Sequence, residues 1–247
     1  MYDAPVRIAA LEMVAGGASL SEVARATGVH RSTLRAWREA DSVLPVECFR
    51  CIFLHPARAD AYSALLGYYL GDGCVSTFRS HTTLRVSCDA TLLGIIADVS
   101  RVVGALHPSG GVFHVAAPGV VVVSTNWKHW PCLFPQHGPG RKHDRPIVLE
   151  DWQRDVVIAH PADFLRGLFH SDGCRTNNWA TRMVGGEKRR YDYPRWQFTN
   201  HSDDVSALCC WALDLIDVPW RRSRRWVVSV SRREAVARLD ELIGPKT

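Results

Sequence analysis

The sequence predicts an α+β protein: a pseudo-twofold pair of αββαββα repeats, preceded by a small all-α domain. Apolar patterns typical of helices and strands recur in the same order with a pitch of roughly 100 residues. Residues 1–42 instead contain only short helical patterns separated by glycines. We therefore expect a helical domain over residues 1–42, a linker over 43–61 and a repeat domain over 62–247, with its repeats at 62–140 and 160–247.

The N-terminal domain is expected to contain three helices, over residues 7–15, 22–26 and 31–39. Ser19 and Ser21 are candidate N-caps of the second helix, and Gly28 supplies the turn before the third. LSEVARATGVHRSTLRAWRE thus resembles a helix-turn-helix of transposases, resolvases and repressors. Its third helix would place polar side chains on base edges and phosphates, namely those of Arg31, Ser32, Thr33 and Arg35. Short trihelical units also serve as protein–protein modules, which is the alternative.

The repeats are defined by matching helices and strands. In the first we expect a helix over residues 62–71, strands over 74–79 and 83–87, a helix over 92–103, and strands over 112–116 and 120–124. In the second we expect a helix over 162–171, strands over 174–183 and 195–199, a helix over 204–216 and a strand over 226–231. VVVVS matches VVSVS, and the closing HGPGRK matches IGPKT. Residues 126–143 are expected to connect the halves, with Trp127, Trp130 and Phe134 packed.

Two similar nonapeptides begin the repeats, LLGYYLGDG over residues 65–73 and LRGLFHSDG over 165–173. Glycine inside a helix costs roughly 1 kcal/mol relative to alanine, so Gly67 and Gly167 need a packing reason. Gly71 and Ser171 follow them four residues later, which gives each helix a stripe of small residues. We expect the two helices to pack side by side at close approach.

Asp72 and Asp172 follow these stripes of small residues, at the C-terminal helix ends. A carboxylate is unfavourable there because the helix dipole is negative at that end, and two such groups also repel each other. A divalent cation would compensate, and Mg²⁺ prefers carboxylate, carbonyl and water ligands. Bound metals activate water for phosphodiester cleavage. An ordinary Asp-Gly turn is the alternative, but its occurrence in two matched positions favours a metal site.

The paired nonapeptides and the element order resemble the LAGLIDADG homing endonucleases of the monomeric, two-motif type, over about three quarters of the chain. The resemblance implies two sheets forming a saddle over double-stranded DNA. It implies Mg²⁺, replaceable by Mn²⁺ or Ca²⁺, bound by Asp72 and Asp172 with the backbone carbonyls of Gly71 and Ser171. The family's water-positioning glutamine matches Gln197. Its lysine after the last strand matches Lys128 in the first repeat and Arg232 or Arg233 in the second. The often acidic sixth motif position is Leu70 and His170 here.

The expected strands carry polar side chains at every second position, which places them on one face of a sheet. Further arginines crowd the C-terminal part of the chain. We expect DNA contacts from Arg85, Ser87, Arg195, Thr199, Arg221, Arg222 and Arg224. Simple solvent exposure is the alternative for each of them.

Composition narrows the class of protein. The 247 residues carry a formal net charge of +5, which is mildly basic. No apolar run is long enough for a membrane span and no signal peptide is evident, so we expect a cytoplasmic, nucleoid-associated monomer. Cys48-x-x-Cys51 could bind structural Zn²⁺ with His55, but a fourth ligand is missing nearby, so zinc is not favoured.

Three functions follow from these patterns. The leading one is a site-specific, Mg²⁺-dependent double-strand DNA endonuclease, a metal-dependent phosphodiester hydrolase of the homing type. The second is a DNA-binding transcriptional regulator that uses the same fold without cutting. The third is a zinc-stabilised interaction protein, which depends on Cys48, Cys51 and the histidine-rich segment over residues 126–143.

Overall fold

The computed structural model describes residues 4–39, 56–77, 81–138 and 140–247. They belong to two compact units, an N-terminal unit over residues 1–52 and a repeat unit over 53–247. The expected linker over 43–61, with Cys48 and Cys51, lies outside the described residues as far as residue 55. From Pro56 the chain is already helical. Within the described ranges, no helix combines the length and the apolar character needed to cross a bilayer.

The N-terminal unit contains three helices, α1 (Ala4–Ala15), α2 (Leu20–Thr27) and α3 (Arg31–Glu39). Ser19 caps α2 as one of the two expected candidates: its Oγ accepts from the Glu22 backbone N–H at 3.3 Å, and Glu22 Oε2 accepts from Ser19 N–H at 2.8 Å. Gly28 ends α2 with a φ of 70°, a left-handed conformation that glycine adopts without strain. A small core of Ala10, Val23, Val29 and Leu34 holds the helices together.

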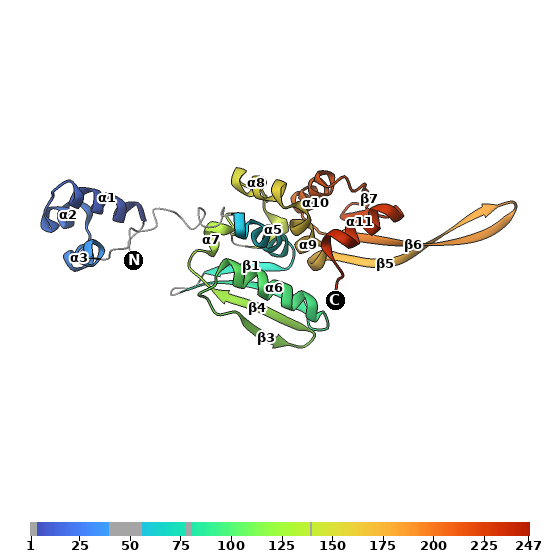
Figure 1. Ribbon diagram of the computed structural model, residues 1–247, viewed down its shortest axis with the longest axis horizontal. Coiled ribbons are helices and arrows are strands. Elements are labelled where there is room, and N and C mark those ends of the chain that lie inside the picture. The colour runs from blue at the N-terminus through green and yellow to red at the C-terminus, as the bar shows by residue number, and fades with distance from the viewer. Residues whose placement is uncertain (1–3, 40–55, 78–80, 139) are drawn as a thin grey trace. The chain divides into compact units, whose positions relative to one another are not determined.

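The repeat unit consists of two αββαββ series joined by a short helical connection (Figure 1). The first series is α5 (Pro56–Leu70), β1 (Gly73–Thr77), β2 (Thr82–Asp89), α6 (Leu93–Leu106), β3 (Phe113–Ala117) and β4 (Val120–Asn126). The connection is α7 (Trp130–Leu133), the 3₁₀ turn η1 (Lys142–Asp144) and α8 (Asp151–Ala159). The second series is α9 (Pro161–Asp172), β5 (Gly173–Val184), β6 (Glu187–Thr199), α10 (Asp203–Leu215), β7 (Arg221–Arg224) and β8 (Val227–Val230), closed by α11 (Arg233–Ile243).

Each series forms one antiparallel sheet of four strands, in the orders β1-β2-β4-β3 and β5-β6-β8-β7. The registers correspond: Cys74 lies opposite Arg85, as Cys174 lies opposite Gln197. Inward-facing Leu84, Val86, Trp196 and Phe198 are buried against the helices. The α+β class and the paired repeats expected from the sequence are thereby confirmed.

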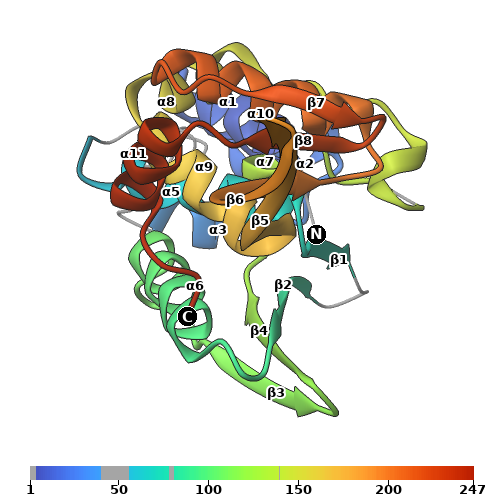
Figure 2. The same ribbon diagram turned by 90° about the vertical axis from the view of Figure 1, so that its right-hand side faces the viewer.

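Helices α5 and α9 lie side by side at the centre of the unit (Figures 1 and 2). A Cβ added to Gly67 would lie 2.3 Å from the Phe164 carbonyl oxygen, and one added to Gly167 would lie 2.2 Å from that of Ala64. Non-bonded contacts of a Cβ atom are essentially never shorter than 3.0 Å, so only glycine permits this approach. The packing reason expected for both glycines is present, and every residue from Ala61 to Leu70 is buried.

Some local elements differ from the expectation. Helix α8 was not expected, and strand β7 fills a place that the αββαββα pattern implied without bounds. Strands β5 and β6 form one hairpin longer than the predicted strands. Trp130 and Phe134 are fully buried as expected, and Trp127 stacks on the His107 ring at 4.4 Å between centroids. His170 is a packed histidine: its Nδ1 lies 3.1 Å from the Tyr68 hydroxyl.

Candidate functional site

The C-terminal ends of α5 and α9 bring Asp72 and Asp172 into one region of the molecule. Asp72 lies two residues after α5 and is exposed, whereas Asp172 is the last residue of α9 and is half-buried. A Cβ on Gly71 would lie 3.3 Å from Asp172 Oδ2, so the second carboxylate lies against the end of the first helix. Asn200 Nδ2 donates to the same Asp172 oxygen at 2.7 Å.

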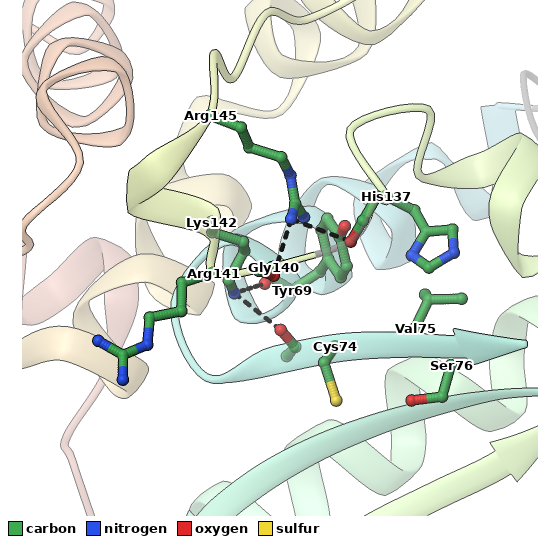
Figure 3. Close-up of a pocket in the computed structure, with 11 residues that line it drawn as sticks. Tyr69, Cys74, Val75, Ser76, His137, Gly140, Arg141, Lys142 and Arg145 are labelled. Atoms are coloured by element: carbon green, nitrogen blue, oxygen red, sulfur yellow. Dashed lines mark hydrogen bonds between the residues drawn. The ribbon is translucent and has the colours of Figure 1, made fainter.

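Two lysines cap these helix ends, in a nearly symmetrical way. Lys142 Nζ donates to the Tyr69 carbonyl and to that of Gly73 at 2.7 Å (Figure 3). It also donates to the Gly71 carbonyl at 2.6 Å. Lys246 Nζ donates to the Ser171 carbonyl at 2.9 Å and to that of Gly173 at 2.7 Å. Carbonyls in the last turn of a helix lack partners within the helix, so the ammonium groups satisfy them and offset the dipole.

Arg145 stabilises the loop that precedes Lys142 by hydrogen bonds to its backbone. Its guanidinium donates to the carbonyls of Gln136 at 3.2 Å, Gly138 at 3.0 Å and Gly140 at 3.0 Å. Lys142 and Arg145 line a cavity of about 320 Å³ beside β1, together with Tyr69 and Cys74 (Figure 3). The hydrogen bonds of Arg145 therefore fix the conformation of the loop that positions the Lys142 ammonium.

The four charged groups perturb one another. The pKa of Asp172 is raised to about 6, chiefly by burial and next by the charge of Asp72, although Asn200 and both lysines oppose the shift. The pKa of Asp72 is also raised by desolvation, although solvent reaches this side chain, and both lysines oppose it. Burial lowers the pKa of Lys142 to about 8 and lowers that of Lys246. Within the described residues, these two lysines are the cations acting on both carboxylates.

The site is expected to bind divalent metal in a pH-dependent way. Because the folded-state pKa of Asp172 is raised to about 6 from 3.8, its ionisation lowers stability as pH rises from about 4 through 6. A cation that bound the ionised form would relieve this penalty. We expect Mn²⁺ to raise the melting temperature of DNA-free protein at pH 7.5 and to have little effect at pH 5. An equal rise at both pH values would contradict the assignment, and Asp172→Asn should remove the rise at pH 7.5.

The donor set near the helix ends fits a hard divalent cation in part. Two carboxylates with raised pKa values suit such an ion, and the buried Ser171 Oγ has no hydrogen-bond partner. The carbonyls of Gly71 and Ser171, expected as ligands, already accept from the lysines, although a carbonyl oxygen has a second lone pair. Among the described residues no cluster of three or more His, Cys, Asp or Glu could hold a metal, so the remaining ligands would be water or an anionic substrate.

The second sheet has a basic hollow of about 570 Å³ on the face away from its core. Its lining includes five of the expected residues, Arg195, Gln197, Thr199, Arg221 and Arg224. Arg195 is more buried than expected, because its Nε donates to Ser229 Oγ at 2.6 Å. Arg222 is not in the lining, and its charge acts on Cys210 of α10 instead. In the first sheet, Arg85 is half-buried and Ser87 is exposed on the corresponding strand.

Other expected residues lie elsewhere. Lys128 is exposed in the turn after β4, where its charge acts on His129, and Arg232 is the exposed N-cap of α11. The roles expected for them beside a metal stay predictions. Lys142, Lys246 and Asn200 were missed, although the matched closing segments HGPGRK and IGPKT contain both lysines.

In the N-terminal unit, α3 presents most of its expected recognition residues to solvent. Arg31, Ser32 and Arg35 are exposed, and Thr33 is half-buried. Ser32 Oγ lies 2.7 Å from His30 Nδ1, which fixes the first turn of the helix. Three of the four expected recognition residues are therefore exposed on α3.

The transposase family model HTH_Tnp_1 matches residues 1–46. No curated protein matches the chain. Among solved structures, I-DmoI in complex with DNA and Mn aligns with a TM-score of 0.50 at 11% identity, over 76% of this chain and 98% of that one. The LAGLIDADG meganuclease I-AabMI bound to uncleaved DNA has a TM-score of 0.46 at 13% identity, over 73% and 82% of the two chains. The N-terminal LAGLIDADG domain of DUF199/WhiA aligns with a TM-score of 0.47 at 15% identity, over 83% of this chain and 92% of that one. The likeness to I-DmoI shows that the repeat unit has a LAGLIDADG fold.

Proposed function

We propose that this protein binds duplex DNA at specific sites and cleaves it with a divalent metal held by Asp72 and Asp172. One observation carries the proposal: two carboxylates with raised pKa values lie at adjoining C-terminal helix ends, where dipoles and mutual repulsion disfavour them. The fold likeness to I-DmoI, whose structure contains DNA and Mn, makes DNA and a divalent metal the ligands to test. Mg²⁺ is the ion we expect, with Mn²⁺ or Ca²⁺ able to substitute.

In this proposal, different residues of the chain have different roles in cleavage. Asp72 and Asp172 would hold the metal, which would supply the activation of water and the stabilisation of the leaving oxygen of a phosphodiester. Lys142 and Lys246 hold the two helix ends and add positive charge where the phosphate's negative charge increases. Gln197, on the strand leading toward Asn200, can orient a water by hydrogen bonding. The arginines of the hollow contact phosphates and base edges.

The N-terminal unit would add a second DNA contact. The match of residues 1–46 to a transposase family model supports a helix-turn-helix, with α3 as the recognition helix. Its exposed Arg31 and Arg35 suit phosphates and guanine edges. This contact would lengthen the recognised site or retain the protein on DNA.

The test starts with selection of genomic fragments that the full chain binds tightly. Each selected duplex is then incubated with protein and Mg²⁺, Mn²⁺ or no metal, and both strands are analysed on denaturing gels. We expect metal-dependent cuts at one site in each strand. Tight, sequence-specific binding without any cut in Mg²⁺ or Mn²⁺ would reject cleavage and retain DNA binding.

A non-cleaving DNA-binding regulator is the second candidate, and one observation favours it. The ammonium groups of Lys142 and Lys246 are bonded to the carbonyls of Gly71 and Ser171, where a metal would need oxygen ligands. In such a protein the lysines would replace the metal as the compensating charges. DNA-free Mn²⁺ binding measured by calorimetry separates the two, since the regulator should bind none.

A further inference from the structure

The hairpin of β5 and β6 makes the two halves of the repeat unit unequal. Strand β1 has 5 residues, whereas its counterpart β5 has 12. Only Trp196–Thr199 of β6 also pair with β8, so the part from Asn177 to Pro194 continues as a two-stranded ribbon. Figure 1 shows this ribbon, which we call the arm, projecting beyond the sheets and helices of the unit. Gly185 and Gly186, with φ values of 59° and 82°, form its two-residue turn.

The arm is exposed on both faces despite its apolar side chains. Every residue from Thr181 to Asp192 is exposed, and the exposed fractions are 56% for Trp179, 68% for Met183 and 46% for Tyr191. An isolated hairpin is only marginally stable in water, and unpaired strand edges promote aggregation. We therefore expect a ligand to cover the arm when the protein functions.

The charge of the arm selects the class of ligand. It contains four cations, Arg182, Lys188, Arg189 and Arg190, and two carboxylates, Glu187 and Asp192. Arg190 bonds Asp192 at 2.7 Å and lies 5.3 Å from the centroid of the Trp179 ring. Among the ion pairs of the described residues, none involves Arg182 or Lys188. Cations interleaved with aromatic rings suit a polyanion better than an apolar protein surface.

The strand register supplies an independent argument for an anion. Arg182 lies directly opposite Arg189, so two like charges face each other on the same side of the ribbon. Such a cross-strand pair destabilises a hairpin. It becomes favourable when a phosphate binds between the two guanidinium groups.

The same side of the ribbon leads back to the hollow of the second sheet. Side chains of a strand alternate, so Arg189, Tyr191 and Tyr193 lie on the side that Arg195, Gln197 and Thr199 occupy further along β6. Tyr193 is fixed there because Asn178 Nδ2 donates to its hydroxyl at 3.1 Å. The arm thus extends the basic surface of the hollow outward, subject to the twist of the ribbon.

We propose that the arm binds the backbone of duplex DNA beyond the segment covered by the two sheets, on the second-repeat side only. The inference rests on the proposed DNA binding and adds an asymmetric footprint to it. The eight residue pairs from Asn177–Pro194 to Val184–Glu187 span about 24 Å, which corresponds to about seven base pairs of B-DNA. A two-stranded ribbon of this kind fits the major groove.

The experiment compares footprints and salt dependence on one selected DNA fragment, using the full chain. The test variant is Arg182→Gln with Arg189→Gln, and the matched control removes a cation from the exposed side of α11, Arg238→Gln. We expect the test variant to lose protection over about seven base pairs at one end of the footprint and to keep the other end. Loss of two phosphate contacts should also reduce the slope of log affinity against log salt by about 1.8. The control should match the wild type in both measurements.

The melting temperature of each variant is measured separately, so that a folding defect is not mistaken for a loss of DNA contacts. The test variant should melt at the wild-type temperature or slightly above it, because a like-charge pair is removed. If it misfolds, Arg189→Gln alone replaces it, with an expected slope change of about 0.9. An unchanged footprint and slope with DNA still bound would overturn the role of the arm alone. A wild-type protein that binds no duplex would overturn both the arm and the proposed function.

Discussion

Asp72→Asn and Asp172→Asn should each abolish metal-dependent DNA cutting while leaving DNA affinity at the wild-type level. Each change removes one of the two carboxylates that can hold the cation, and metal contributes several kcal/mol to phosphodiester cleavage. We expect a rate loss of about three orders of magnitude, since each 1.36 kcal/mol corresponds to a factor of ten. Single-turnover cleavage of a bound duplex measures the rate, and a binding titration in Ca²⁺-free buffer measures affinity.

The control for these variants is Glu241→Gln on the exposed surface of α11, which removes the same charge away from the helix ends. It should cut at the wild-type rate. Asp72→Asn protein that still cuts at the wild-type rate would remove this residue from the metal site. A parallel loss of binding and cutting would instead point to a structural role for the carboxylate. In metal-free protein at pH 7.5, Asp172→Asn should raise stability, because it removes a carboxylate whose pKa is held near 6 by burial.

Gly67→Ala should have the largest effect on stability among conservative substitutions in α5. The added methyl carbon would lie 2.3 Å from the Phe164 carbonyl oxygen and 2.8 Å from the Leu168 nitrogen, which are backbone atoms of a packed helix. Overpacking of this kind costs about 3 kcal/mol, which outweighs the gain of roughly 1 kcal/mol in helix propensity. The net loss of about 2 kcal/mol should lower the melting temperature by about 4–8 °C for a domain of this size.

Gly104→Ala is the matched control, because Gly104 also lies within a helix, α6, but has no atom within 4 Å of the added carbon. This substitution should stabilise the protein by up to about 1 kcal/mol through helix propensity alone. Thermal or denaturant unfolding of the two variants tests the pair. Equal effects of the two substitutions would mean that α5 and α9 do not approach as closely as the structure places them.

Sequence reasoning was most successful where the chemistry repeats within the chain. Gly67 and Gly167 recur at the same motif position, and the structure confirms that each lies against the other helix. Asp72 and Asp172 could be assigned to the helix ends for the same reason. Cys48 and Cys51 lie outside the described residues, so the zinc hypothesis stays a prediction.

The lysines illustrate what a pattern alone does not locate. The matched segments that contain Lys142 and Lys246 were visible, yet the pattern placed the cations directly after the last strands, at Lys128 and at Arg232 or Arg233. Lys142 reaches the end of α5 from 71 residues away and Lys246 reaches the end of α9 from 75 residues away. Contacts across such separations depend on how loops fold back over the helices, and no local periodicity encodes them.

The sequence by itself determined the α+β class, the two repeats, the helix contact at the glycines and the pair of carboxylates. Periodicity and repetition can be recognised along the chain without knowledge of the three-dimensional structure. Tertiary structure decided which cations face those carboxylates, how far burial shifts their pKa values and which arginines share the hollow of the second sheet. It also decided that the β5–β6 hairpin leaves the sheet as an exposed arm. Burial and electrostatic interaction depend on distances between residues remote in the chain, and only the folded arrangement fixes those distances.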